Sequence, residues 1–287
     1  MTEPLVLTTP AEIARWRHDG PLGLVPTMGA LHAGHASLIE RAVAECDDVV
    51  VSIFVNPAQF NDPTDLERYP RPFERDLAVA RRHGATAIYA PEVETIYPAG
   101  HATSIHVAGI TERWEGEKRP GHFDGVATVV SILLNQVKPD RAYFGEKDWQ
   151  QLAMLRRMVA DLSLPGEIVA CPLVRDEDGL ALSSRNARLT PPQREAALII
   201  PRTLEMLRAQ VAAGERSVRT LLTFGGALLA GDQRIRVEYL TIVNPTTLEP
   251  ITTIIDGEGA RALVAVQIGE TRLIDTMDLT ANDADEA

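Results

Sequence analysis

The sequence is poor in cysteine, in aromatic residues and in net positive charge. Its 287 residues include only two cysteines, Cys46 and Cys171, and neither lies in a CxxC or metal-ligand spacing. This argues against a disulfide framework or a zinc site and is typical of free thiols in a reducing compartment. The formal net charge of −12 lacks the basic footprint of a nonspecific nucleic-acid binder, and it offers no attraction to an anionic membrane surface.

Long apolar runs are also missing. No apolar stretch reaches the length of about 18 residues that a transmembrane helix needs. The N-terminal residues MTEPLVLTTPAEIARW show no basic segment followed by an apolar one, so we expect no signal peptide and a cytoplasmic location. Apolar residues make up 45% and charged residues 24% of the chain, as in ordinary globular proteins of one large domain or two. The last residues, 280–287, predict a solvated tail.

The first 170 residues alternate between strand and helix patterns. A capping box at Thr9-Pro10-Ala11-Glu12 predicts the first helix. Further helices are expected at 34–46, 73–83, 123–137 and 148–162, and strands at 22–25, 49–55, 86–90, 142–144 and 167–170. This alternation predicts an α/β fold, a Rossmann-like doubly wound parallel sheet. Ligands of such folds bind outside the carboxyl ends of the strands, at the switch point of the strand order.

The pattern changes after Cys171-Pro172. A capped helix should begin at Thr190, and Pro201 should kink or end it. The segments that follow predict a helix at 217–230 and strands at 234–243 and 262–268. We therefore expect a smaller α+β unit, with domains at 1–173 and 174–287.

The string VPTMGALHAGHASLI (25–39) is the first candidate for chemistry. It places His32 and His35 three residues apart, on one face of the first turn of a helix. A helix N-terminus favours phosphate, glycines at 29 and 34 permit close approach to the backbone, and imidazole N–H groups can donate to phosphate oxygens. Two capping histidines beside an ordinary turn would also fit HxGH alone, but the full string is more specific.

Two further segments follow predicted strands. FVNPAQF (54–60) supplies the neutral amides of Asn56 and Gln59, which suit a substrate with hydroxyls and a carboxylate, although Asn-Pro is also a common turn. FGEKDWQQL (144–152) places Gly145, Lys147 and Asp148 at a strand-to-helix junction. Lys147 could reach phosphates there as a compact charge, or it could be a surface lysine.

Three other groups of polar residues are less specific. Ser183 and Ser184 precede Arg185, which makes a possible polyphosphate clamp or a plain loop. In RPGHFDG (119–125), Arg119 and His122 are candidates for ligand contact, but the chemistry of a Pro-Gly turn explains much of the string. DGLALSSRN (178–186) begins at a turn, so the clamp would lie in the second domain.

Together these strings resemble the pantothenate synthetase family of the HIGH-type nucleotidyltransferase superfamily. They occur in the order of that family and, with YLTIVNPTTLEP and TRLID near the C-terminus, cover nearly the whole chain. The resemblance implies a Rossmann-like domain for nucleotide and pantoate, a smaller C-terminal lid domain and usually a homodimer. It implies ATP-dependent joining of pantoate to β-alanine through a pantoyl-adenylate, with release of pyrophosphate and AMP.

The resemblance also implies a role for individual residues. Catalysis would involve His32, His35, Lys147, Ser183 and Arg185. The ATP site would include Met28, Gly145, Lys147, Asp148, Val174, Leu182, Ser183, Ser184 and Arg185. Pantoate would contact Asn56, Gln59 and Gln151. ATP brings Mg²⁺, which prefers phosphates, waters and one or two carboxylates, and Asp76 is the candidate carboxylate unless it is simply a surface helix acid.

The chain departs from the family pattern at three positions. Trp149 stands where Tyr is usual, Leu182 where Met is usual, and Thr276 where Asn often follows RLID. Other functions remain open on the residues alone. A nucleotidyltransferase acting on another small acid would keep the histidines without needing paired amides, and a nucleotide-binding regulator could lose Lys147 and SSRN. A tRNA ligase would need a tRNA-binding domain, for which the sequence gives no sign.

Overall fold

The computed structural model describes residues 3–16 and 20–281, and the chain divides into two units. The N-terminal unit contains Met1–Gly145 and Gln150–Cys171, and the C-terminal unit contains Glu146–Trp149 and Pro172–Ala287. The chain therefore passes between the units at 145/146, 149/150 and 171/172. The boundary expected near residue 173 lies beside the last of these passages. Residues 282–287 of the expected tail lie outside the described residues.

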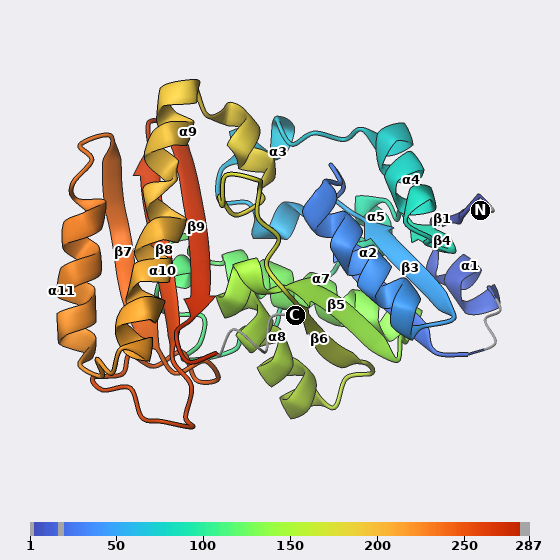
Figure 1. Ribbon diagram of the computed structural model, residues 1–287. Helices are drawn as coiled ribbons and strands as arrows, with labels where there is room; N and C mark the ends of the chain where they lie inside the picture. The colour runs from blue at the N-terminus through green and yellow to red at the C-terminus, as the bar shows by residue number, and fades with distance from the viewer. Residues whose placement is uncertain (1–2, 17–19, 282–287) are drawn as a thin grey trace. The chain divides into compact units, whose positions relative to one another are not determined.

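A six-stranded parallel sheet forms the centre of the N-terminal unit (Figure 1). Its strands run in the order β1-β4-β3-β2-β5-β6, and every neighbouring pair is parallel. The strands are β1 Leu5–Leu7, β2 Leu22–Thr27, β3 Asp48–Ile53, β4 Ala87–Tyr89, β5 Arg141–Gly145 and β6 Glu167–Cys171. The doubly wound parallel sheet is thus confirmed, and only the short edge strand β1 has no counterpart among the predicted strands.

The strand order reverses between β2 and β5. Strand β2 pairs with β3 on one side, from which the sheet continues to β4, and with β5 on the other side, from which it continues to β6. Parallel strands end at the same edge of a sheet, so the carboxyl ends of β2 at Thr27 and β5 at Gly145 flank the switch point. This is the place where open α/β sheets bind their ligands.

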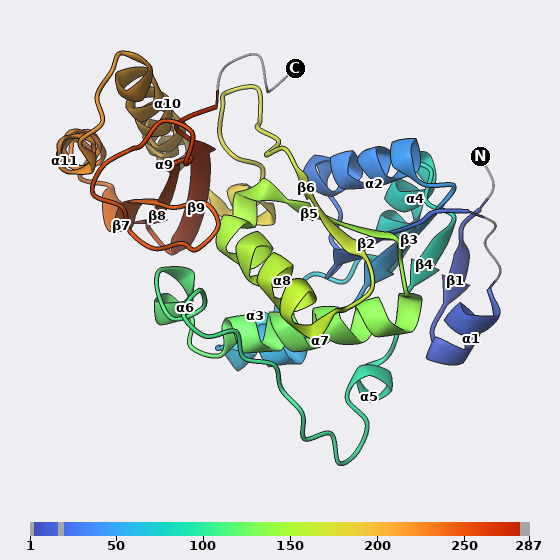
Figure 2. The ribbon, with the colours of Figure 1, turned by 90° about the horizontal axis from the view of Figure 1, so that it is seen from below.

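Helices cover both faces of this sheet. Figure 2 shows α2 Ala33–Glu45 and α4 Phe73–Arg82 on one face, with α7 His122–Val137 and α8 Trp149–Leu162 on the other. The first face is closed by side chains such as Ile39, Val51 and Ile88, which are 0% exposed, and each contributes about 1.5–3 kcal/mol by leaving water. The unit also contains the short helices α1 Pro10–Arg15, α3 Pro63–Glu67, α5 Val93–Ile96 and α6 Glu115–Lys118.

The predicted helix starts agree with the structure. Thr9 is the N-cap of α1, and its hydroxyl accepts from the Glu12 N–H while the Glu12 carboxylate accepts from the Thr9 N–H. The capping box expected from the sequence is therefore confirmed. None of the helices in the described residues is long and apolar enough to cross a bilayer.

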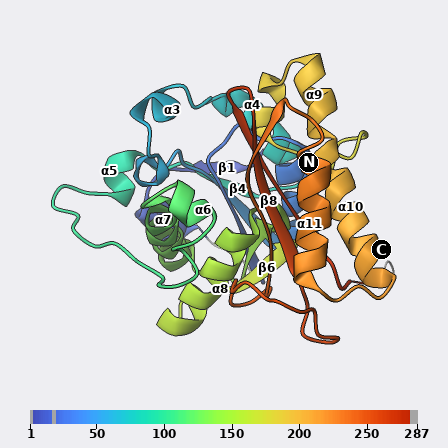
Figure 3. The ribbon, with the colours of Figure 1, turned by 90° about the vertical axis from the view of Figure 1, so that its left-hand side faces the viewer.

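The C-terminal unit is a three-stranded antiparallel sheet with helices on one face (Figure 3). Its strands β7 Ile235–Val243, β8 Arg261–Ile268 and β9 Thr271–Asp278 follow the order β7-β8-β9. The helices are α9 Pro191–Ala197, α10 Ile199–Ala212 and α11 Val218–Leu229. Leu204 of α10 and Leu221 of α11 pack with Val264 of β8 in one apolar cluster. Strand β9 was not predicted, because Arg272, Asp275 and Asp278 interrupt its apolar residues.

The prediction that Pro201 kinks or ends the helix is wrong about where the helix breaks. The break comes earlier, at Leu198, between α9 and α10. Pro201 lies in the first turn of α10, where a missing N–H costs no helical hydrogen bond, and its ring would clash with the carbonyl four residues before it if the helix were continuous. The proline therefore favours a new helix start rather than a helix end.

Two helical glycines give opposite expectations for substitution by alanine. A Cβ on Gly125 of α7 would lie 2.4 Å from the carbonyl oxygen of Ala58, whereas one on Gly226 of α11 would meet nothing within 4 Å. We expect Gly125→Ala to lower the free energy of unfolding by about 1–3 kcal/mol. Gly226→Ala should raise it by about 0.5–1 kcal/mol. Urea unfolding of both variants tests this, and equal effects would contradict the tight packing of α7.

Candidate active site

The loop after β2 is held by one buried carboxylate. Gly29 and Ala30 have positive φ values of 80° and 52°, so the backbone turns sharply before α2. The Asp76 carboxylate of α4 accepts from the Ala30 N–H at 2.8 Å and from the Leu31 N–H at 2.7 Å, one on each oxygen. A Cβ on Gly29 would lie 2.8 Å from the same carboxylate. The sharp turn and the glycine therefore follow from the close approach of Asp76.

This arrangement bears on the expected magnesium contact. Asp76 is 1% exposed, and both of its oxygens already accept backbone hydrogen bonds. Such a carboxylate fits a loop anchor better than a ligand for Mg²⁺, which keeps several waters in its shell. The described residues contain no group of three or more His, Cys, Asp and Glu side chains arranged to hold a metal ion. We therefore assign no step of the chemistry to a protein-bound metal.

The two histidines form the N-terminal cap of α2. His32 is the N-cap residue, and its Nδ1 accepts from the Gly34 N–H at 3.1 Å. The Nδ1 of His35 accepts from the His32 N–H at 3.4 Å, and the two ring centroids lie 4.1 Å apart. An Nδ1 that accepts has no proton, so this hydrogen-bond network assigns the proton of each neutral imidazole to Nε2. The cap thus fixes both rings as Nε2–H donors at a helix N-terminus.

A cavity of about 270 Å³ lies in the N-terminal unit, beside this loop. It is lined by residues at or just after the ends of β2, β3 and β4, by the start of α5, and by α4 with the segment before it: Met28, Ile53, Phe54, Val55, Arg71, Phe73, Asp76, Ala90, Pro91, Glu92 and Val93. Met28, which was expected at the ATP site, is among them. The cavity therefore opens at the carboxyl edge of the sheet, where ligands of this fold bind.

The side-chain amides of Asn56 and Gln59, which follow β3, differ in how far they are already hydrogen-bonded. Asn56 is 1% exposed; its Nδ2 donates to Gln59 Oε1 and to the Gly125 carbonyl, both at 3.0 Å. Its Oδ1 accepts from the Ala58 N–H and from the Tyr97 hydroxyl. All four hydrogen-bonding positions of Asn56 are therefore used. Asn56 orients Gln59, and its own expected contact with pantoate stays a prediction.

The Tyr97 hydroxyl is a dependable donor in this network. Burial raises the pKa of Tyr97 to about 12, so the hydroxyl stays protonated at neutral pH. Its oxygen lies 2.8 Å from Asn56 Oδ1. The Asn56 amide is thereby fixed with its nitrogen toward Gln59.

The main chain of Gln59 is held from the other side. His122, at the start of α7, has its Nδ1 2.8 Å from the Gln59 carbonyl oxygen, and its Nε2 lies 3.0 Å from Arg119 NH1. A guanidinium donates only, so His122 accepts at Nε2 and donates from Nδ1 to the carbonyl. The structure thus gives Arg119 and His122, both candidates for ligand contact, a role in holding Gln59.

Two adjacent glutamines at the start of α8 have different surroundings. Gln150 is 4% exposed; its Nε2 donates to the Ile110 and Arg113 carbonyls, and its Oε1 accepts from the Glu115 N–H. Gln151 is only half-buried, and its side chain makes no hydrogen bond within the described residues. Gln150 therefore fastens the loop before α7, while ligand binding by Gln151 stays a prediction.

In the C-terminal unit, Lys147 lies in the one-turn 3-10 helix Glu146–Asp148. Its side chain is 19% exposed, and its Nζ lies 3.9 Å from Asp148 Oδ2. Helix α8 begins at Trp149, directly after Asp148. A Cβ on Gly145, at the end of β5, would meet none of the described residues within 4 Å, so these residues leave the chain before Lys147 open to close approach.

The SSRN segment forms a 3-10 helix over Ser184–Arg188. Ser183 is its N-cap and accepts from the Arg185 N–H at 3.2 Å, while Ser184 is exposed. Arg185 is half-buried and makes no ion pair within the described residues. Leu182 donates its N–H to the Val174 carbonyl at 3.0 Å, so these two residues expected at the ATP site are neighbours.

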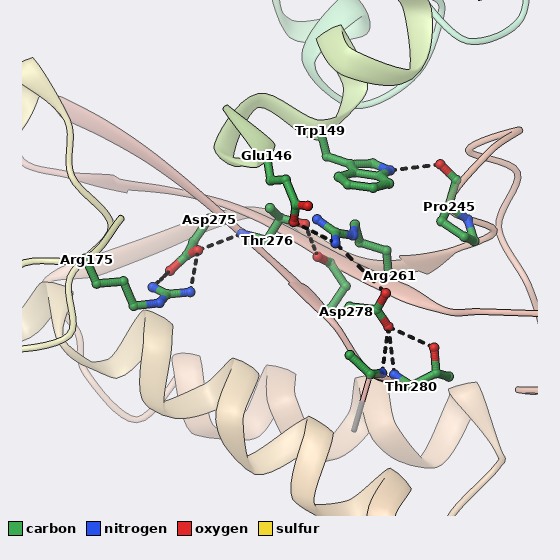
Figure 4. Close-up of polar contacts among 11 residues, drawn as sticks. Glu146, Trp149, Arg175, Pro245, Arg261, Asp275, Thr276, Asp278 and Thr280 are labelled. Carbon is green, nitrogen blue, oxygen red and sulfur yellow. Dashed lines mark hydrogen bonds and ion pairs between the residues drawn. The ribbon is translucent and has the colours of Figure 1, made fainter. Parts of the chain in front are cut away.

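Ion pairs hold the chain that leads to SSRN. Arg175 donates to both oxygens of Asp275 at 2.7 and 3.1 Å (Figure 4). Burial raises the pKa of the Asp275 carboxyl, although Arg175 opposes that shift. On the turn itself, Arg194 donates to Asp176 and Asp178, and this contact lowers the pKa of Asp178.

A family model described as pantoate–β-alanine ligase matches residues 6–278. The chain belongs to the pantoate–β-alanine ligase family. It is 52% identical to a pantothenate synthetase of Deinococcus radiodurans over 266 residues, covering 91% of this chain and 94% of that relative. It is 49% identical to a pantothenate synthetase of Koribacter versatilis over 265 residues, covering 92% of this chain and 90% of that relative.

Solved structures agree with this membership. The crystal structure of a pantothenate synthetase of Thermus thermophilus matches with a TM-score of 0.91 and 47% identity, covering 96% of this chain and 100% of that one. A pantoate–β-alanine ligase of Francisella tularensis, complexed with Beta-gamma ATP and β-alanine, matches with a TM-score of 0.75 and 31% identity, covering 97% and 99%. The chain is therefore a ligase that joins pantoate to β-alanine.

The three departures from the family pattern have different structural settings. Trp149 is 9% exposed and donates from Nε1 to the Pro245 carbonyl at 2.8 Å. Thr276 is 4% exposed and donates from its hydroxyl to the Ala262 carbonyl. Leu182 is only half-buried. Sequence reasoning missed the anchoring roles of Asp76 and Gln150, because single buried polar residues leave no periodic signal.

Asp76 gives a direct test of the loop anchor in this ligase. Asp76→Asn replaces one accepting oxygen by an amide that faces a backbone donor, so stability should fall by about 1–3 kcal/mol. Turnover should fall about tenfold or more, because the loop that leads into His32 and His35 is no longer held in one conformation.

The matched control is Asp140→Asn. Asp140 accepts from the Leu22 N–H at 2.7 Å, at the opposite end of β2. This change should affect stability alone. Steady-state turnover with a parallel unfolding curve distinguishes the two, and normal turnover in Asp76→Asn would refute the anchor.

Proposed function

We propose that the chain condenses pantoate with β-alanine in two steps, of which the first consumes ATP. A carboxylate oxygen of pantoate attacks the α-phosphorus of ATP, and pyrophosphate leaves with the electrons of the broken P–O bond. The β-alanine amine then attacks the carbonyl of the pantoyl-adenylate, loses a proton and displaces AMP. The observation that carries this proposal is the pair of Nε2–H donors at the start of α2, beside the switch point of a sheet that binds nucleotides in this fold.

The histidines would act by stabilising charge on phosphorus. A helix N-terminus already favours anions, and fixed imidazole donors need no reorganisation as the transition state forms. His32 and His35 therefore suit an in-line displacement in which no residue becomes covalently attached. The Francisella tularensis ligase was crystallised with Beta-gamma ATP and β-alanine, and this complex supports ATP and β-alanine as substrates here.

The acid would be held by neutral amides. Gln59 is held through both its side chain and its main chain, and the Gln151 amide makes no hydrogen bond in the described part of the chain. Donors and acceptors of this kind match the hydroxyls and the carboxylate of pantoate without adding charge. We assign pantoate binding to Gln59 and Gln151, with Asn56 holding the Gln59 side chain.

The remaining assignments follow the family motifs. Lys147, Ser183, Ser184 and Arg185 would bind the ATP phosphates, and Met28, Gly145, Asp148, Val174 and Leu182 would line the rest of the nucleotide site. Mg²⁺ would enter with the phosphates of ATP and lower their charge. A homodimer remains a prediction from the family resemblance, and a cytoplasmic location remains a prediction from the sequence.

Isotope exchange tests the adenylate directly. We expect pantoate alone to support exchange of label between pyrophosphate and ATP, because the first step needs no amine. Other small carboxylic acids in the same assay distinguish this reaction from adenylation of a different acid. Exchange that strictly requires β-alanine would count against a free adenylate.

Two substitutions of His35 separate its role as the acceptor that caps α2 from its role as an Nε2–H donor. His35→Asn keeps an oxygen near the Nδ1 position for the His32 N–H but lacks the Nε2 donor, so turnover should fall about 10²–10³-fold. His35→Gln places an amide nitrogen near the Nε2 position and should retain more activity. The adenylate rate in a single turnover measures both, and an Asn variant as active as the parent would remove His35 from the mechanism.

A further inference from the structure

The segment Glu146–Trp149 carries Lys147 into the C-terminal unit. It leaves the N-terminal unit after Gly145, and the chain returns to that unit at Gln150. A segment of four residues with a one-turn 3-10 helix has too few hydrogen bonds of its own to hold the Lys147 side chain in one position. The position of Lys147 must therefore be set by what the segment is attached to.

The attachment is the face of the three-stranded sheet that the helices leave open. Along β8, Ala262, Val264 and Val266 face the helices and pack in their apolar cluster. Successive side chains of a strand point to opposite faces, so Arg261 points to the other face. Figure 4 shows Glu146 and Trp149 on that side of the sheet, with the helices on the opposite side.

Arg261 contacts both ends of the segment. Its NH2 lies 3.0 Å from Glu146 Oε2, and its guanidinium carbon lies 3.3 Å from the centroid of the Trp149 ring. The Arg261 side chain is 5% exposed, so its guanidinium is largely shielded from water in both contacts. An arginine can make both contacts at once because its planar guanidinium stacks with its face and donates from its edge.

Two further contacts make this attachment rigid. Trp149 donates from Nε1 to the Pro245 carbonyl at 2.8 Å, which fixes the ring over Arg261. Asp278, opposite Arg261 on β9, has a carboxylate oxygen 4.0 Å from the Arg261 NH2. The other oxygen of Asp278 accepts from Thr280. Glu146 and Trp149, which flank Lys147 and Asp148, are thus both held by Arg261.

We propose that Arg261 is a positioning residue for Lys147, acting through Glu146 and Trp149. The inference rests on the proposed function, in which Lys147 binds the phosphates of ATP. Arg261 itself touches no reacting atom in this proposal. Its role is to hold the 146–149 segment so that the Lys147 ammonium has one direction of approach.

The test measures adenylate formation in a single turnover at saturating ATP and pantoate. Arg261→Met removes the charge and the planar group while keeping an unbranched side chain. We expect a loss of about tenfold or more, with a smaller change in the later reaction of added β-alanine with the adenylate. Arg261→Lys keeps a charge for Glu146 but cannot stack in the same way, so it should recover only part of the rate.

The matched control is Arg272→Met. Arg272 donates to Glu238 at 2.8 Å and lies on the same face of the sheet at its other end, because it pairs with Gln267 whereas Arg261 pairs with Asp278. It should keep the adenylate rate within about twofold, since independent sites do not couple. A loss equal to that of Arg261→Met would overturn the proposal in favour of general damage to the sheet.

A double variant separates positioning from folding. If Arg261 acts through Lys147, then Arg261→Met should change the rate by less than about twofold once Lys147→Met is present. The same fold-loss in both backgrounds would overturn the proposal, as would a normal rate in Arg261→Met when Lys147→Met is impaired. A normal rate in Lys147→Met would instead refute the proposed function of Lys147 itself, and the positioning role with it.

Glu146→Gln covers the case in which Arg261→Met does not fold. The Glu146 side chain is 27% exposed, so the change is mild for the fold and removes only the charge that pairs with Arg261. We expect a several-fold loss that also disappears in the Lys147→Met background. An unchanged rate in Glu146→Gln would overturn the route through Glu146.

Discussion

The reversal of strand order between β2 and β5 is the constraint on which the candidate site depends. Parallel strands all end at one edge, so the loops after β2, β3 and β5 leave the sheet on the same side. His32 and His35, at the start of α2, follow β2. Gln59, in the 3-10 helix Pro57–Gln59, follows β3, and Gly145 ends β5. No local feature of any one loop would bring such residues to a common edge. The parallel sheet does so because its twist and its crossover helices leave few other paths for the chain.

Around this edge, three buried polar side chains are held by hydrogen bonds to the protein itself. Asp76, Asn56 and Gln150 are each under 5% exposed and direct their oxygens or nitrogens at backbone groups. A buried polar group without a partner is costly, so these residues are held to one conformation. Gln151, whose side chain makes no hydrogen bond within the described residues, lies next to Gln150 in the chain. A side chain that is held in one conformation therefore lies beside one whose amide can still donate.

The sequence predicted the long elements well because their signals are local. The β-branched run of β3 and the capping box at Thr9 each carry the whole signal for one element. The anchoring roles of Asp76 and His122 could not be predicted, because each depends on a partner that is distant in sequence. Strand β9 was missed for a related reason: Arg272, Asp275 and Asp278 look solvent-exposed until their partners Glu238, Arg175 and Arg261 are known. Motif resemblance supplied the candidate residues, but it did not say which of them the fold already uses.

The passage of residues 146–149 into the C-terminal unit limits how this protein can be divided. A fragment that starts at Pro172 would contain all of β7, β8 and β9, yet it would lack Glu146 and Trp149. Arg261, which is 4% exposed in the intact chain, would then lose the carboxylate and the indole that shield it, and a cation on a bare apolar face invites misfolding or self-association. The C-terminal unit is compact without being a transferable module. Gene fusion or domain exchange at the obvious boundary would separate the sheet from a segment of chain that completes it.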